Sequence, residues 1–90
     1  MTLDEAIGLA IKLSRQSQGL SQEEIGASQS FVSDVERGKK SMTVQRLDAF
    51  ACRLGVHPAA LMVQAALIAN PSMNIDLLFD NIKNDLRVKQ

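Results

Sequence analysis

Residues 20–40 read LSQEEIGASQSFVSDVERGKK, two short helical patterns separated by a glycine-containing corner. In the second pattern, Phe31, Val32 and Val35 keep helical spacing, so one stripe of this helix should face inward. The positions between them carry short polar side chains: Gln29, Ser30, Ser33 and Asp34. Serine and aspartate form helices less readily than the glutamate and lysine usual on a solvated face. This face therefore favours contact with polar groups such as base edges over simple solvation.

Length and composition place the chain among small, all-α proteins. Ninety residues make one domain with a modest core. Glycine and proline are scarce and 46% of the residues are hydrophobic, which argues against disorder. The formal net charge is zero, whereas nucleic-acid-binding domains are usually basic. Such binding is still compatible with this balance, because the distribution of charge matters more than its sum.

Several classes of protein are disfavoured by the sequence. The single Cys52 cannot form an internal disulfide, which suits a reducing compartment. Asp4 and Glu5 stand where a signal peptide would carry positive charge. The longest apolar run, residues 59–69, has about half the length of a membrane span. We therefore expect a soluble, cytoplasmic protein with no membrane partner.

Capping and stop signals divide the chain into six helical segments. Capping boxes begin the first two, at Thr2 with Glu5 and at Ser21 with Glu24. Ser28 and Thr43 are further N-caps, and glycines at 19, 38 and 55 are stop signals. The expected helices cover residues 3–18, a short stretch between 21 and 26, then 28–37, 44–54, 58–69 and 72–88.

The apolar residues of these segments repeat with a helical period and predict the core. In the first helix the inward stripe is Leu3, Ala6, Ile7, Ala10 and Leu13 or Ser14, and in the fourth it is Val44, Leu47, Phe50, Ala51 and Leu54. The fifth helix begins with Pro58 and is apolar nearly all round, so we expect it to be covered on more than one side.

The last helix carries an apolar stripe of Ile75, Leu78, Phe79, Ile82 and Leu86 with charges opposite. Together, this stripe and the second face of the fifth helix provide more apolar surface than a five-helix core needs. The surplus favours a homodimer. The expected dimer interface contains Leu67, Ile68, Ile75, Leu78, Phe79 and Ile82. A partner-binding groove and a purely intrachain core remain alternatives. The chain divides into a domain at 1–69 and a C-terminal extension at 70–90.

Three consecutive motifs carry a family resemblance: LSRQSQGLSQEE (13–24), SQSFVSDVERGKK (28–40) and TVQRLDAFACRLGV (43–56). Over residues 9–62 the chain resembles the helix-turn-helix domain of the Cro and phage-repressor (XRE-like) family, which includes restriction-modification controllers and many antitoxins. The resemblance implies a compact five-helix, lambda-repressor-like domain whose third helix enters the DNA major groove. The C-terminal helix lies outside the family core.

The resemblance also implies roles for individual residues. Ser28, Gln29, Ser30 and Ser33 fall on groove-facing positions, while Gln22 should touch a phosphate and brace the third helix. Arg15 and Glu36 match a pair that forms an internal salt bridge. The expected DNA contacts are Gln22, Ser28, Gln29, Ser30, Ser33, Arg37, Lys39, Lys40 and Thr43. For the third helix an ordinary surface helix is the alternative, and for the lysines a solvated loop.

The chain departs from the family pattern in the second helix. Members carry about four more residues between the glutamate pair and the turn, whereas here Ile25, Gly26 and Ala27 follow Glu24 directly. A loss of about four residues removes close to one helical turn. Either the second helix is one turn shorter, or residues 20–26 form its body.

Taken together, these features predict a sequence-specific, double-stranded-DNA-binding regulator, a dimeric repressor of a palindromic operator. The alternatives are an antitoxin that also binds a toxin, and an interaction module that has lost DNA binding. We expect no enzymatic activity, cofactor or metal, since zinc takes about four ligands. Cys52 should therefore be a small packing residue and His57 a helix cap.

Overall fold

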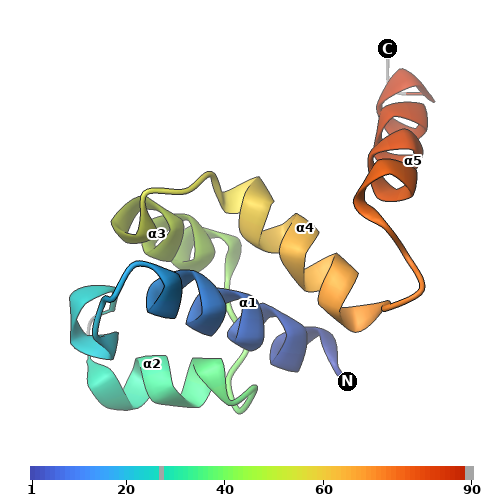
Figure 1. Ribbon diagram of the computed structural model, residues 1–90. Helices are drawn as coiled ribbons and strands as arrows, with labels where there is room; N and C mark the ends of the chain where they lie inside the picture. The colour runs from blue at the N-terminus through green and yellow to red at the C-terminus, as the bar shows by residue number, and fades with distance from the viewer. Residues whose placement is uncertain (27, 89–90) are drawn as a thin grey trace.

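The computed structural model describes residues 1–26 and 28–88, and within them every regular element is helical (Figure 1). Ala27, in the predicted turn, and residues 89–90 of the predicted extension lie outside the described residues. The elements are α1 (Leu3–Ser17), the 3₁₀ turn η1 (Gln22–Glu24), α2 (Gln29–Glu36), α3 (Val44–Leu54), α4 (Pro58–Ala69) and α5 (Ile75–Val88). The predicted all-α class is confirmed.

Local capping explains where these helices begin. The Thr2 hydroxyl accepts from the Glu5 amide at 3.1 Å, and the Thr2 amide donates to Glu5 Oε1 at 2.8 Å. Thr43 Oγ1 likewise accepts from the Arg46 amide at 3.1 Å. The His57 ring accepts from the Ala59 amide at 3.0 Å, as predicted for a cap. Each cap satisfies an amide that has no partner in the first helical turn.

The second helix is shorter than predicted. Only the three residues of η1 form a turn, so the proposed helical body over residues 20–26 is wrong. The Leu20 carbonyl accepts instead from Arg15 Nη1 at 2.9 Å, and Ser21 is extended, with φ −79° and ψ 163°. Ile25 is fully buried directly after the turn. Too few residues therefore separate Ser21 from this anchor for an α-helical ladder to propagate.

The core lies where α1 packs against both α2 and α4, with α3 packed on α4. It consists of Ala6, Ile7, Ala10, Ile11, Ile25, Val32, Val35, Leu47, Phe50, Ala51, Leu54, Leu61 and Ala65. The inward stripe predicted for α1 was partly wrong, because Leu3 and Leu13 are exposed and Ile11 is buried. The approach of α2 and α4 selects a face of α1 centred on Ala6, Ile7, Ala10 and Ile11.

A close approach of α1 and an exposed turn of α3 shape the surface around α2. A Cβ at Gly8 of α1 would overlap the carbonyl oxygen of Val35, so glycine permits the contact between α1 and α2. Val44, predicted in the core, is 80% exposed, and residues 43–46 around it are all exposed as well. The first turn of α3 is therefore part of the outer surface.

Helices α3 and α4 meet at a bend of 104°. Gly55 ends α3 with φ +70°, and Pro58 occupies the first turn of α4. In the described residues no single helix is long and apolar enough to cross a membrane. The bent pair α3–α4 meets that criterion by length and composition only.

The C-terminal helix α5 stands away from the body formed by α1 to α4 (Figure 1). It begins at Ile75, three residues later than predicted, because the Asn74 side chain accepts from the Leu77 amide at 2.8 Å and caps it. No described side chain of α5 is fully buried. On α4 only Leu61 and Ala65 are fully buried, so its outer side is less covered than predicted.

Candidate nucleic-acid interface

Helix α2 is amphipathic, with a buried apolar side and an exposed polar side. Val32 and Val35 are buried, and Phe31 packs edge-on against Phe50 with ring centroids 6.2 Å apart. The polar side begins at the N-cap Ser28, whose Oγ accepts from the Phe31 amide at 3.2 Å. Of the residues predicted to read bases, Ser28, Gln29 and Ser30 are exposed and Ser33 is half-buried. The structure therefore places these four residues on one accessible ridge.

A buried ionic network holds α2 in place. Arg15 donates from Nε to Glu36 Oε2 at 2.7 Å and from Nη2 to Oε1 at 3.0 Å. The expected pair between Arg15 and Glu36 is thus present and bidentate, and its hydrogen bonds raise the pKa of Arg15. Gln22 Nε2 donates to the same Glu36 Oε1 at 3.0 Å. Glu36 is 8% exposed, so one carboxylate joins α1, η1 and α2 in a site largely closed to water.

The basic residues predicted to bind phosphate gather at the C-terminal end of α2. Arg37, Lys39 and Lys40 are all exposed. Arg37 lies 3.1 Å from Asp34 Oδ1, and Lys40 lies 3.9 Å from Asp34 Oδ2. These exposed pairs are weak, but they keep two cationic groups close to the ridge.

The loop after α2 is attached to the body of the protein. Gly38 has φ +74°, and a Cβ there would overlap Glu5 of α1. Ser41 Oγ donates to Asp4 Oδ2 at 2.7 Å. These contacts hold the loop against the first turn of α1, and the following Thr43 is exposed while it caps α3.

Arg46 is a surface residue that the sequence reasoning missed. Its guanidinium carbon lies 4.5 Å from the centroid of the Phe31 ring, and Lys40 Nζ lies 5.4 Å from the same centroid. Phe31 therefore supports two cations beside the polar ridge, through cation–π contacts. An exposed arginine in the first turn of the helix after α2 was the available signal. Its importance depends on the ring below it, which the sequence pattern assigned only to the core.

A family model described as helix-turn-helix matches residues 11–61, more than half of the chain. The chain belongs to the Cro/C1-type helix-turn-helix family. The matched part of this helix-turn-helix protein runs from α1 into the first turn of α4 and includes η1 and α2. It therefore contains both the ionic network and the polar ridge.

The crystal structure of the clp gene regulator ClgR from C. glutamicum is similar to this helix-turn-helix protein. The sequences are 28% identical, the TM-score is 0.69, and the match covers 83% of this chain and 97% of that chain. No protein of curated function matches the sequence significantly. The family and the fold support a DNA-binding transcriptional regulator.

The remaining polar candidates do not form a metal centre in the described part of the chain. Cys52 is exposed on α3, which corrects the prediction that it is a small packing residue. The described residues hold no group of three or more histidine, cysteine or acidic side chains that could bind a metal ion.

Proposed function

We propose that this protein is a dimeric transcriptional repressor that binds a palindromic operator in the cytoplasm, with α2 lying in the DNA major groove. The supporting observation is the polar ridge of Ser28, Gln29, Ser30 and Ser33 on a helix fixed by a buried network. A short polar helix held so rigidly can present its side chains to bases without losing further conformational freedom.

Two kinds of DNA contact follow from the chemistry of this surface. Gln29 can make a bidentate pair with adenine, while Ser28, Ser30 and Ser33 can hydrogen-bond to several base edges. Arg37, Lys39, Lys40 and Thr43 are assigned to the sugar-phosphate backbone, together with Arg46. Gln22 donates to Glu36, and its remaining polar atoms are assigned to a phosphate. Phosphate contacts position the protein, and base contacts give it sequence preference.

Dimerisation would supply the basic surface and the number of DNA contacts that one copy lacks. The chain has no net charge, and one short recognition helix offers few contacts. Two copies related by a two-fold axis would read half-sites about 34 Å apart and double the basic surface. The division into residues 1–69 for DNA and 70–90 for dimerisation agrees with the position of α5 apart from the body. Repression then follows from occupation of the operator, which excludes polymerase.

The decisive experiment compares two variants on DNA. Binding sites are first selected from a random pool with the wild-type protein, and each variant is then titrated against single-base substitutions of the selected site. Gln29→Ala should lose preference at one or two positions, because a bidentate pair contributes about 1–3 kcal/mol of discrimination. Lys39→Ala should weaken binding to all sites equally. It should also reduce the salt slope, which is the slope of the logarithm of the binding constant against the logarithm of the salt concentration, by about one. If both variants behave alike, α2 does not read the bases.

One alternative is an antitoxin that binds DNA through the same ridge and a toxin through its C-terminal part. The specific observation in its favour is an apolar groove between α4 and α5, lined by residues of both helices. A second, different protein that purifies in stoichiometric complex with the chain would support it. Failure to bind DNA at low and moderate salt would instead favour an interaction module.

A further inference from the structure

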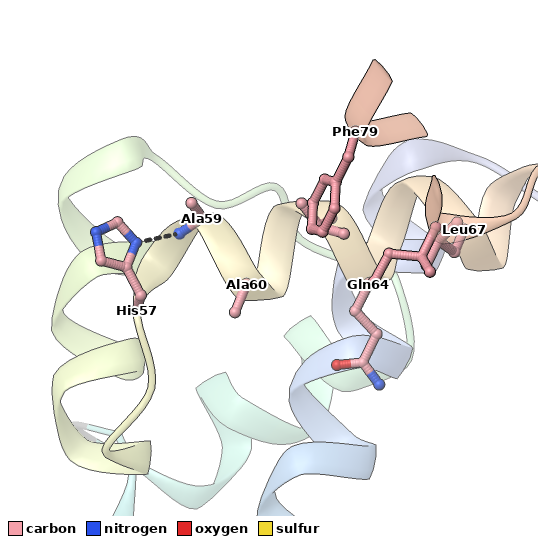
Figure 2. Close-up of a pocket in the computed structure, with 8 residues that line it drawn as sticks. His57, Ala59, Ala60, Gln64, Leu67 and Phe79 are labelled. Carbon is pink, nitrogen blue, oxygen red and sulfur yellow. Dashed lines mark hydrogen bonds between the residues drawn. The ribbon is translucent and has the colours of Figure 1, made fainter. Parts of the chain in front are cut away.

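An apolar groove of about 460 Å³ lies between α4 and α5 (Figure 2). Helix α4 contributes Ala59, Ala60, Val63 and Leu67 to its walls, and α5 contributes Ile75 and Phe79. Figure 2 shows Phe79 projecting from α5 toward α4. Apart from His57 and Gln64, the residues that line the groove are apolar, so apolar side chains could fill the space between the two helices.

Helix α5 carries a coiled-coil seam that extends beyond this groove. Ile75, Phe79, Ile82 and Leu86 are separated by four, three and four positions, the spacing of alternating core positions in a heptad. The first two line the groove, while Ile82 and Leu86 lie further along the helix. Leu86 is 57% exposed. Ile75 and Phe79 therefore line the groove, whereas Ile82 and Leu86 are apolar side chains that could fill such a groove in another molecule.

A second copy in antiparallel orientation would match these two halves. With a two-fold axis near residues 80 and 81, Ile75 meets Leu86 of the second copy and Phe79 meets its Ile82. Every core position then has an apolar partner, and the same contacts repeat on the other side of the axis. Such an interface is self-complementary and closes at two subunits.

Charge decides between antiparallel and parallel packing. Asp76 and Lys83 each follow a seam residue, so both lie on the same edge of the seam. Antiparallel packing brings Asp76 beside Lys83 of the second copy, twice in the dimer. Parallel packing brings Lys83 beside Leu78 of the second copy and leaves Asp76 without a basic neighbour. The ion pairs therefore select the antiparallel arrangement.

We propose that α5 pairs with α5 of a second copy in antiparallel register, and that Ile82 and Leu86 of each copy fill the α4–α5 groove of the other. This inference rests on the dimer proposed above and specifies its interface. It adds Asp76, Lys83 and Leu86 to the residues expected there.

The first test compares two leucines of the same helix. Leu86→Ala removes a seam residue, whereas Leu77→Ala removes a leucine that is 49% exposed on the opposite side of α5. Sedimentation equilibrium should show the dimer dissociation constant rising roughly ten-fold or more for Leu86→Ala, since each dimer loses two buried side chains. Leu77→Ala should leave the constant unchanged. Circular dichroism checks that both variants keep their helices.

The second test establishes the register. Asp76→Lys and Lys83→Asp each place like charges together, and each should weaken the dimer by roughly two- to thirty-fold. The double variant should recover wild-type affinity, because the exchanged charges again lie side by side. Residues 76 and 83 are two turns apart within one helix, so recovery must come from the second copy. Additive losses in the double variant would overturn the antiparallel register.

The outcomes also separate this inference from the proposed function. A wild-type protein that is monomeric at tens of micromolar, or equal effects of the two leucine variants, would overturn the α5 interface. So would a different protein occupying the α4–α5 groove in the purified complex. Operator selection is measured independently, and α5 variants should still bind an isolated half-site weakly. If wild-type protein dimerises as described but selects no DNA, the proposed function fails and the interface stands.

Discussion

Helices α2 and α5 both present one face to solvent, and the two faces are chemically opposite. Helix α2 has eight residues, too few for stability alone, and is held by buried Val32, Val35 and Glu36. Helix α5 has fourteen residues, and none of its described side chains is fully buried. The exposed side of α2 is polar, whereas that of α5 is apolar over its seam.

The comparison shows that an exposed face indicates a different kind of partner on a helix that is held in place, such as α2, than on a helix that stands apart, such as α5. A polar face on a helix fixed by a buried network favours recognition of a polar ligand at little cost in entropy. An apolar face on a helix with no fully buried side chain among its described residues favours a protein partner. Under the proposed function, DNA reading and self-association are assigned to two different helices.

The largest effect should come from the network that fixes α2. Glu36→Gln leaves the guanidinium of Arg15 without its carboxylate in a nearly closed site. We expect a loss of about 3–5 kcal/mol in the free energy of unfolding, measured in urea. The matched change on α5, Asp80→Asn, removes an exposed acid and should cost less than about 0.5 kcal/mol. Equal losses for the two variants would mean that α2 is no more firmly held than α5.

A smaller loss of stability should follow from adding a methyl group at the contact between α1 and α2. Gly8→Ala places a Cβ against the Val35 carbonyl oxygen. Alanine favours the helix by about 0.5–1 kcal/mol, but overpacking costs about 1–3 kcal/mol, so we expect net destabilisation. Ala49→Gly, at an exposed site of α3, measures the propensity contribution by itself. A stabilised Gly8→Ala protein would show that the two helices can move apart freely.

The polar surface around α2 is tested by Arg46→Ala. Loss of the contact with Phe31 should change stability by only about 0.5–1 kcal/mol. Affinity for all DNA sequences should fall together, and the salt slope should decrease by about one. Arg53→Ala removes the same charge from the last turn of α3 and serves as the control. If Arg53→Ala weakens binding as much, only net charge matters and the surface beside α2 is not special.

The smallest effect is expected in the pH dependence of unfolding, through the capping hydrogen bond of Glu5 in α1. The hydrogen bond from the Thr2 amide lowers the pKa of Glu5 below its ordinary value of 4.5. Its contribution to stability is therefore present above that value and is lost as the pH falls through the lowered pKa. Glu5→Gln should remove this part of the acid dependence of unfolding. A pH profile of Glu5→Gln identical to that of the wild type would contradict the role of the cap.

Sequence alone determined the class of the fold, most helix ends and the identity of the polar ridge. Thr43, Gly55 and Pro58 correctly marked the ends of α3 and the start of α4, because caps and stops depend on atoms only a few residues apart. The serines and Gln29 of α2 were predictable for the same reason, since the apolar spacing of their own helix determines which way they face.

Tertiary structure decided which faces are covered and which residues meet across the chain. Ile11 is buried in place of Leu13 because α2 and α4 approach α1 from particular directions. Arg46 reaches the Phe31 ring, and η1 remains a single turn, through contacts between separate segments. Such contacts depend on the relative placement of elements distant in sequence, and helical periodicity within one segment carries no information about that placement.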